Sequence, residues 1–251
     1  MSSQQDRICR LCGKTVVLCN SHIIPEFFYT RMYDTKHRFF IINNDPDRDE
    51  LLIQKGVREK LLCRDCEKKF SKLEGYVRNL FYGKSKLSVY KDGEYLRIQN
   101  LDCAKFKLFL LSMLWRMGVA RLKWFNEVAL GPHEEKIRCQ LLNSQPGEPD
   151  QYPCVVIATM LNGRFSGNWI LPPQKVRVLS YHCYRVVVGG FLFVFWVSSH
   201  KPPSALMEVV PKTSGEFAIR LEEIRAIGFL ADAWQQIGRA IRAREGDAEP
   251  Q

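Results

Sequence analysis

Two Cys-x-x-Cys pairs, Cys9 with Cys12 and Cys63 with Cys66, constrain the fold of this chain more than any other feature. A Cys-x-x-Cys turn directs two sulfur atoms toward one ion, and two such turns supply the four thiolates that zinc prefers in structural sites. Fifty residues separate the pairs, so the intervening chain must fold to bring two distant turns together. We expect these four cysteines to bind one structural zinc ion. The alternative is four buried or redox-active thiols.

The remaining cysteines do not form pairs in the sequence. The chain has nine cysteines in 251 residues, too few for a small disulfide-rich scaffold. The segment Met1–Arg10 is polar and no apolar segment follows it, so we expect no signal peptide and a reduced, cytoplasmic protein. The five isolated cysteines are expected in the core: Cys19, Cys103, Cys139, Cys154 and Cys183.

Composition places the chain among globular proteins of one or two domains. Hydrophobic residues make up 46% and charged residues 25%, which argues against a disordered or collagen-like chain. The longest apolar run, Val186–Val197, contains two glycines and is shorter than the roughly 20 residues that a membrane-spanning helix needs. We therefore expect no membrane association.

The net charge of +10 is concentrated around the second cysteine pair. Residues 55–91 contain eleven basic residues and four acids, a net charge of +7. Such an excess favours a polyanionic partner, although most charge runs are simply solvated surface. Six basic residues near the cysteines are the candidate nucleic-acid contacts: Arg58, Lys60, Arg64, Lys68, Lys69 and Lys72.

A short motif lies between the cysteine pairs. Ser21-His22-Ile23-Ile24-Pro25 reads as an apolar strand that carries His22 and ends at the proline. Further along, Leu61-Leu62 reads as the end of a strand that passes into a helix at the second cysteine pair, as in treble-clef-like modules. Taken alone, His22 could equally be a core histidine or a zinc ligand.

This combination resembles the HNH, or ββα-metal, endonuclease superfamily in its zinc-stapled form, and a bacterial subset with a Ser-His-Ile-Ile-Pro and Leu-Leu-Cys-x-x-Cys-Glu pattern. The resemblance implies a zinc-stapled ββα-metal module in which His22 is the general base that activates a water. It also implies a catalytic Mg²⁺ or Mn²⁺ ion at the scissile phosphate. By analogy, it suggests a role in bacterial defence.

Three positions depart from the pattern of that family. Ser21 stands where an acidic metal ligand commonly precedes the histidine, Arg58 stands at the place of the middle asparagine, and Glu67 replaces the last histidine. A carboxylate is a better Mg²⁺ ligand than an imidazole, so Glu67 could preserve metal binding. Glu74 lies seven residues later, on nearly the same helix face. We therefore expect His22, Glu67 and Glu74 to form the catalytic site, although both glutamates could be ordinary surface carboxylates.

Three functions follow from these patterns. The first is a metal-dependent HNH-like endonuclease, a hydrolase of phosphodiester bonds acting on DNA more than on RNA. The second is a catalytically inactive, zinc-containing nucleic-acid-binding or regulatory protein, which the missing asparagine and histidine favour. The third is a protein-interaction module in which zinc only holds the fold. A protein partner or a homo-oligomer is compatible with each.

The whole chain is expected to have an α+β fold, with a zinc-stapled module over residues 1–82 and an α+β region over residues 83–251. Asp92-Gly93, between alternating apolar residues, predicts a hairpin. The second region is expected to contain helices over about 103–142, an antiparallel sheet over about 154–210 and a C-terminal helix over about 221–244.

The helical part is divided into one helix over 103–128 and another over 133–142. Arg116 interrupts the apolar stretch of the first helix, so we expect it to be buried and paired or to reach a phosphate.

Overall fold

The computed structural model describes residues 7–34, 36, 39–41, 51–53, 56–83, 87–167 and 169–236. It has an α+β fold, as the sequence predicts. Its helices are α1 (Arg64–Phe81), α2 (Cys103–Val119), α3 (Pro132–Asn143) and a C-terminal helix described over 228–236. Short 3-10 segments are η2 (Glu26–Phe28), η3 (Lys123–Phe125), η4 (Ser204–Glu208) and η5 (Ile224–Ala226). Its strands are β1 (Leu18–His22), β2 (Phe39–Ile41), β3 (Leu51–Ile53), β4 (Arg58–Cys63), β5 (Ser88–Asp92), β6 (Tyr95–Gln99), β7 (Cys154–Leu161), β8 (Arg164–Phe165), β9 (Ile170–Val178), β10 (Tyr181–Val188), β11 (Phe191–Trp196) and β12 (Phe217–Glu223).

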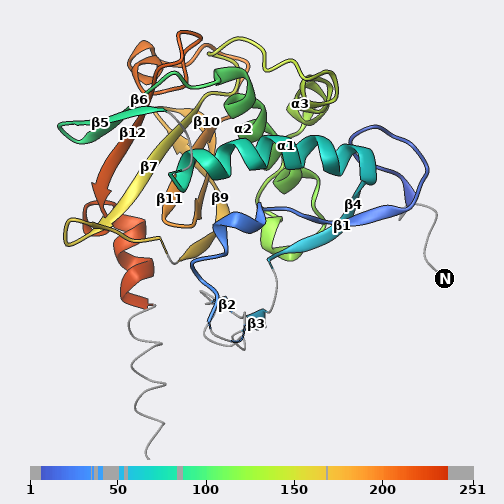
Figure 1. Ribbon diagram of the computed structural model, residues 1–251, viewed down its shortest axis with the longest axis horizontal. Coiled ribbons are helices and arrows are strands. Elements are labelled where there is room, and N and C mark those ends of the chain that lie inside the picture. Colours follow the sequence, from blue (N-terminus) through green and yellow to red (C-terminus); the bar gives the residue numbers. More distant parts are fainter. Residues whose placement is uncertain are drawn as a thin grey trace, which may run out of the picture.

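The N-terminal part contains the strand pair β1–β4, the short pair β2–β3 and helix α1. β1 pairs antiparallel with β4, and α1 begins at the residue that follows β4. The helix forms here because Cys66, Phe70 and Val77, spaced four and seven residues apart, bury one face of it. Figure 1 shows that α1 begins at the end of β4, runs beside the β1–β4 pair and extends toward the large sheet.

The large sheet contains eight strands in the order β5-β6-β12-β7-β11-β10-β9, with β8 paired to β7. The antiparallel sheet predicted over about 154–210 is confirmed for β7 to β11, but the sheet also contains strands outside that range. The hairpin β5–β6 and strand β12 also belong to the sheet, and β12 runs parallel to β7. Strand β12 takes an inner position because Phe217, Ala218 and Ile219 are all buried there. The predicted hairpin around Asp92-Gly93 is confirmed.

Strand β11 separates two apolar layers. Phe191, Phe193 and Phe195 point to the face that α1 and α2 cover, whereas the alternate residues of the strand join a second cluster with the chain at 224–234. The first layer contains residues from both sides of position 82. Phe28 packs against Phe193 at 5.8 Å and Phe81 against Phe191 at 4.4 Å between ring centres. The division into regions 1–82 and 83–251 stays a prediction.

The first long helix is shorter than predicted. α2 ends at Val119 and not at 128, because Ala120 adopts an extended conformation with ψ 141°. Gly118 lets the returning chain approach closely, since a Cβ there would lie 2.4 Å from the side chain of Leu130. The chain therefore turns back and packs on its own helix. The helix predicted over 133–142 is confirmed as α3.

The C-terminal helix also begins later than predicted. Residues 221–223 belong to β12 and residues 224–226 to η5, so that the helix begins at 228 and is described to 236. The predicted residues 237–244 lie outside the described part of the chain. Glu223 ends the strand by accepting hydrogen bonds from the amides of Asn162 and Gly163. Within the described residues, no helix is long and apolar enough to span a membrane.

Candidate functional site

The first cysteine pair lies in a tight turn that is attached to β4. The amide of Gly13 donates to the carbonyl of Cys9 at 2.8 Å, and the φ of 73° at Gly13 is one that a glycine adopts readily. The amide of Arg10 donates to the carbonyl of Leu61 at 3.0 Å. This bond holds the turn beside the strand that leads to the second pair.

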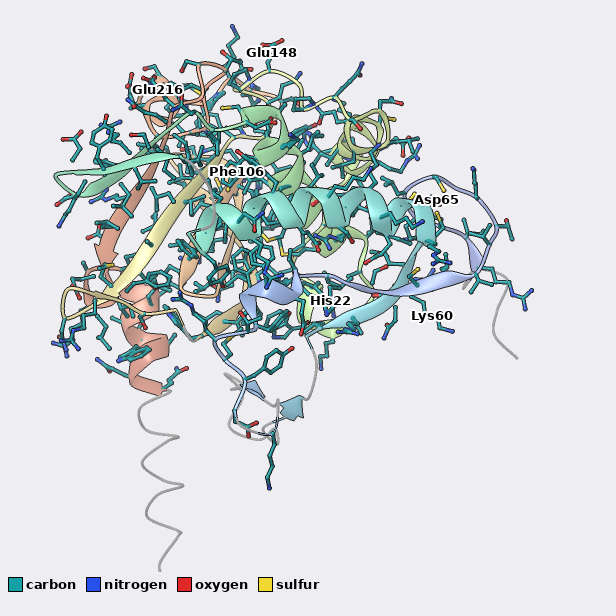
Figure 2. All side chains as sticks on the ribbon, viewed as in Figure 1. His22, Lys60, Asp65, Phe106, Glu148 and Glu216 are labelled. Atoms are coloured by element: carbon teal, nitrogen blue, oxygen red, sulfur yellow. The ribbon has the colours of Figure 1, made fainter. Side chains whose placement is uncertain are left out.

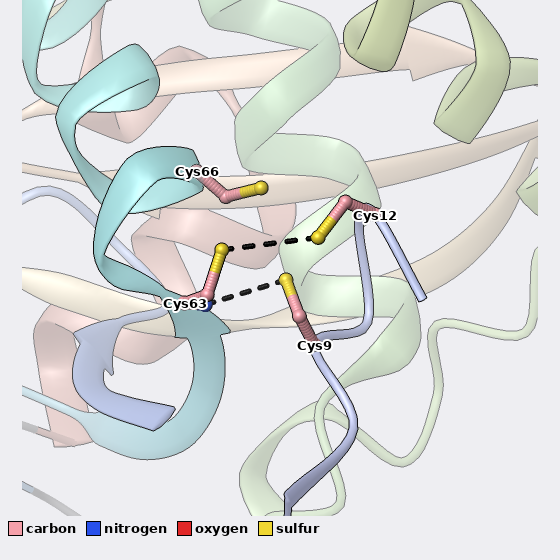
Figure 3. Close-up of side chains that lie close together, drawn as sticks. All are labelled: Cys9, Cys12, Cys63 and Cys66. Carbon is pink, nitrogen blue, oxygen red and sulfur yellow. Dashed lines mark hydrogen bonds between the residues drawn. The ribbon is translucent and has the colours of Figure 1, made fainter. Parts of the chain in front are cut away.

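The second cysteine pair begins α1. Cys63 is the N-cap residue and Cys66 lies in the first turn. The amides at a helix N-terminus carry partial positive charge, which favours thiolates over thiols at this position. The amide of Cys63 itself donates to the sulfur of Cys9 at 3.3 Å and so links the two pairs (Figure 3).

The four sulfur atoms all lie within 4.8 Å of one another. The sulfurs of Cys12 and Cys63 are 3.8 Å apart. A zinc ion at about 2.3 Å from four tetrahedral sulfurs places neighbouring sulfurs about 3.8 Å apart, so the separation fits such a site. Cys9, Cys63 and Cys66 are buried and Cys12 is partly exposed. These four cysteines are positioned to bind a metal ion, whereas the five other cysteines join no such group among the described residues.

Burial opposes ionisation of these thiols when no cation balances their charge. It raises the pKa of Cys9 and of Cys66. Burial is also the largest single influence on Cys63, but hydrogen bonds with Cys66, Cys9 and Cys12 together outweigh it and lower the pKa of Cys63. A bound divalent cation supplies the positive charge that allows all four to be thiolates.

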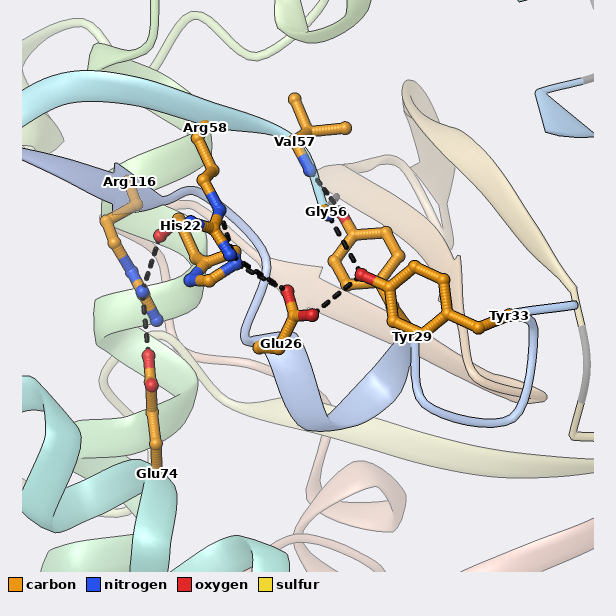
Figure 4. Close-up of polar contacts among 9 residues, drawn as sticks. All are labelled: His22, Glu26, Tyr29, Tyr33, Gly56, Val57, Arg58, Glu74 and Arg116. Atoms are coloured by element: carbon orange, nitrogen blue, oxygen red, sulfur yellow. Dashed lines mark hydrogen bonds and ion pairs between the residues drawn. The ribbon is translucent and has the colours of Figure 1, made fainter. Parts of the chain in front are cut away.

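His22 lies at the opposite end of the β1–β4 pair from the cysteines. In the ladder Leu18 is opposite Cys63, and His22 is opposite Arg58. The His22 Nε2 atom accepts a hydrogen bond from Nε of Arg58 at 2.8 Å and lies 2.5 Å from Oε2 of Glu26. Figure 4 shows these side chains with Tyr33, and we call His22, Glu26, Tyr33 and Arg58 the His22 cluster.

Opposing influences act on the pKa of His22, and their net effect lowers it. Burial lowers the pKa of His22, and the neighbouring Arg58 guanidinium lowers it further, whereas Glu26 opposes both. A neutral imidazole that accepts a hydrogen bond at Nε2 carries its proton on Nδ1. The contact between Nε2 and Oε2 of Glu26, at 2.5 Å, instead requires a proton between those two atoms, so the two contacts favour opposite protonation states of Nε2.

Glu26 is held in place by the chain before β4. Its Oε1 accepts a hydrogen bond from the hydroxyl of Tyr33 at 2.7 Å, and that hydroxyl in turn accepts from the amide of Gly56 at 3.0 Å. A side chain at Gly56 would collide with Tyr29, since a Cβ there would lie 2.6 Å from the ring. The absence of a side chain at Gly56 thus allows the two chain segments to meet.

Of the two predicted metal-binding glutamates, Glu67 contacts β1 directly and Glu74 is linked to it through Arg116. Glu67 accepts a hydrogen bond from the hydroxyl of Ser21 at 2.7 Å. Glu74 pairs with Nη1 of Arg116 at 2.8 Å, and the same nitrogen donates to the carbonyl of His22 at 2.7 Å. Both contacts agree with the prediction that the glutamates share one face of α1. Arg116 is buried and paired, as predicted.

The six predicted nucleic-acid contacts divide into two groups. Lys60, Arg64, Lys68 and Lys72 are exposed, and the last three recur every four residues along one face of α1. Lys69 donates instead to the carbonyl of Leu142, and Arg58 belongs to the His22 cluster. Figure 2 shows His22 and Lys60 along the edge that β1 and β4 form, with Asp65 at the start of α1.

Sequence reasoning did not identify Glu26 and Tyr33. A signal for Glu26 exists, because it lies four residues after His22 and follows the proline that ends the strand. No such signal exists for Tyr33, whose contact depends on how the chain returns to Gly56. Comparison of the chain with protein-family models, with curated proteins and with solved structures gives no match.

Proposed function

We propose that this protein is a zinc-containing, HNH-like endonuclease that hydrolyses phosphodiester bonds with a second divalent cation. The observation that carries this proposal is the contact between Ser21 and Glu67, whose oxygen atoms are 2.7 Å apart. In the family that the sequence resembles, the residues at these two positions bind the catalytic metal. Here they come together on β1 and α1, and Ser21 precedes His22 directly along β1.

The proposed reaction assigns one role to each group. His22 takes a proton from the attacking water at Nε2, a role that its lowered pKa supports. Arg58 and Glu26 orient the imidazole through their contacts with the same nitrogen. For this step the bond from Arg58 must open, so that the Arg58 guanidinium is free to contact a phosphate oxygen.

The donor set at Ser21 and Glu67 suits a hard cation. Mg²⁺ is commonly held by one or two carboxylates, with waters and phosphate oxygens completing the shell. Glu67 is partly exposed and supplies one carboxylate, and the Ser21 hydroxyl supplies a second oxygen. Such an ion would stabilise the leaving oxygen. Zinc is the natural occupant of the four-cysteine site, because four sulfur ligands suit it.

Cleavage of plasmid DNA, single-stranded DNA and RNA tests the proposal, with Mg²⁺ or Mn²⁺ supplied in excess. We expect His22→Ala to lower the rate on the order of 100-fold or more, because it removes the general base. His182→Ala is a matched control on β10, far along the chain from the site. Equal cutting by wild type and His22→Ala would show that the activity is contamination. Both variants should retain zinc and wild-type circular dichroism.

A second candidate is a protein that binds nucleic acid without cleaving it. The observation that favours it is the occupancy of His22 Nε2 by Arg58, which stands where the family has an asparagine. In that case binding should depend on salt, and Lys68→Gln with Lys72→Gln should reduce the salt slope by about 1 to 2. Lys175→Gln with Arg177→Gln, two exposed basic residues on β9, serves as the control.

A further inference from the structure

A cavity of about 490 Å³ lies where the segment after η2 meets the β7–β8 hairpin and the C-terminal helix. It is lined by Arg31, Leu161, Arg164, Phe165, Ser166, Gly167 and Trp234. Two cations and two aromatic rings therefore border it, and no acidic side chain does. The cavity at His133 and Lys136 includes Asp150, and the cavity at Tyr90 includes Asp92, Glu208 and Glu216.

The aromatic and basic groups of this cavity are arranged as a stacking surface. The guanidinium carbon of Arg31 lies 5.1 Å from the centre of the Tyr82 ring and 5.8 Å from that of Phe165. Phe165 is 37% exposed although its ring packs against Phe191 at 4.9 Å between centres. One side of the ring is thus supported by the core while part of its surface faces solvent.

The backbone at Gly167 makes this arrangement possible. A Cβ on Gly167 would lie 2.7 Å from the ring of Phe165 and 3.3 Å from the guanidinium of Arg31. Trp234 contributes a second ring and packs against Trp169 at 6.0 Å between centres. Among the described residues Arg31 and Arg164 take part in no ion pair, so no carboxylate neutralises either charge there, and Arg31 contacts only the rings of Tyr82 and Phe165 through its guanidinium. The nearby Glu223 carboxylate is used by the amides of Asn162 and Gly163.

We infer that this cavity binds an unpaired nucleotide of a single-stranded nucleic acid. Base faces become available for stacking only when a base is unpaired, and aromatic rings beside arginines are the groups that recognise them. The base stacks on Phe165, and Arg31 and Arg164 contact the adjoining phosphates. This inference rests on the proposed nuclease function and deepens it, because η2 carries Glu26 of the His22 cluster at its start and leads to Arg31.

Fluorescence anisotropy tests the inference with a labelled oligothymidine and a labelled hairpin of equal phosphate content, with no Mg²⁺ or Mn²⁺ added. We expect the wild-type protein to bind the single strand more tightly than the hairpin. Phe165→Ala and Phe165→Leu should each weaken single-strand binding about tenfold. The leucine variant keeps apolar packing against Phe191 and so separates stacking from folding. Tyr90→Ala, an exposed aromatic on β5, should bind as the wild type does.

The outcomes separate this inference from the proposed function. If Phe165→Leu and Arg164→Gln bind the single strand as tightly as wild type, or if the wild type does not bind it, the cavity is not the nucleotide site. If cleavage depends on His22 in that case, the nuclease proposal stands without the inference. If single-strand binding depends on Phe165 but no substrate is cut, the nucleotide site stands and the nuclease proposal fails.

Discussion

The two ends of the β1–β4 ladder hold two different kinds of site. At one end Leu18 pairs with Cys63, and the four cysteine sulfurs lie close together. At the other end His22 pairs with Arg58, and its imidazole contacts the Arg58 guanidinium and the Glu26 carboxylate. Four residues of strand, roughly 13 Å, separate the two ends. The four cysteines are positioned to bind a metal ion, whereas the side chains of the His22 cluster contact one another.

This difference indicates how the two ends are stabilised. The cysteine cluster needs an external cation, because burial alone raises the pKa of Cys9 and Cys66. The His22 end is held by residues from elsewhere in the fold: Arg116 on α2 binds the His22 carbonyl, and η2 supplies Glu26. Metal should therefore control the stability of one end and side-chain contacts that of the other.

Loss of the metal should have the largest effect. Cys63→Ser removes one thiolate and breaks the link between Cys63 and Cys12, so we expect zinc content to fall from about one ion per chain to near zero. Because metal binding contributes on the order of 10 kcal/mol in small zinc sites, the cooperative unfolding transition should be lost or strongly lowered. Elemental analysis and thermal denaturation measure both effects.

Cys139→Ser is the matched control for that variant, since Cys139 is an exposed thiol on α3. Its zinc content and stability should equal those of wild type within about 0.5 kcal/mol. If Cys63→Ser stays folded without metal at wild-type stability, the claim that metal stabilises the cysteine end of the ladder is wrong.

The ion pair between Arg116 and Glu74 should have the next largest effect. Arg116 has 1% of its side chain exposed, so Glu74→Gln leaves a buried guanidinium without its counter-charge. We expect a loss of about 3 kcal/mol in the free energy of unfolding, with zinc still bound. The double variant Arg116→Met with Glu74→Gln should recover part of that loss. Chemical denaturation measures it, and an additive double variant would show that the pair is not coupled.

The sequence predicts these two ends to different extents. The four cysteines follow from repetition of one motif, because each Cys-x-x-Cys turn directs two sulfur atoms toward one ion whatever the chain between the turns does. The ion pair of Arg116 is foreseen as a buried charge, but its partner Glu74 depends on how α1 packs on α2. The contact of Tyr33 with Glu26 depends on chain closure at Gly56 and leaves no pattern in the sequence.

The same reasoning explains where the prediction of the fold from the sequence was wrong. Periodicity predicts that α2 extends to 128, because Leu122 and Phe125 continue its apolar spacing. Those residues lie beyond the turn at Ala120 and join the apolar core from there, and Leu130 then approaches α2 at Gly118, so tertiary contacts override the local pattern. Likewise β12 is buried in the sheet by pairing with β6 and β7, which local sequence does not reveal.

Acid should destabilise the His22 end before it protonates the carboxylates. The native pKa of His22 is lowered, so between that value and the unfolded value of about 6.5 the unfolded state binds more protons. Stability should therefore be full above about pH 6.5 and fall as the pH decreases, by at most about 1.4 kcal/mol per pH unit for this group. His22→Gln should reduce that slope. Zinc content at each pH separates this effect from metal loss, and an unchanged slope would contradict it.

The smallest expected effect concerns the support of Glu26. Tyr33→Phe removes the hydroxyl that donates to Glu26 and accepts from the Gly56 amide, and we expect a loss of about 1 kcal/mol in the free energy of unfolding. Zinc content should not change, because Tyr33 lies at the other end of the ladder from the cysteines. Tyr90→Phe, at an exposed tyrosine on β5, should be neutral. If Tyr33→Phe instead released zinc, the two ends would form one cooperative unit, and the distinction between metal and side-chain control would fail.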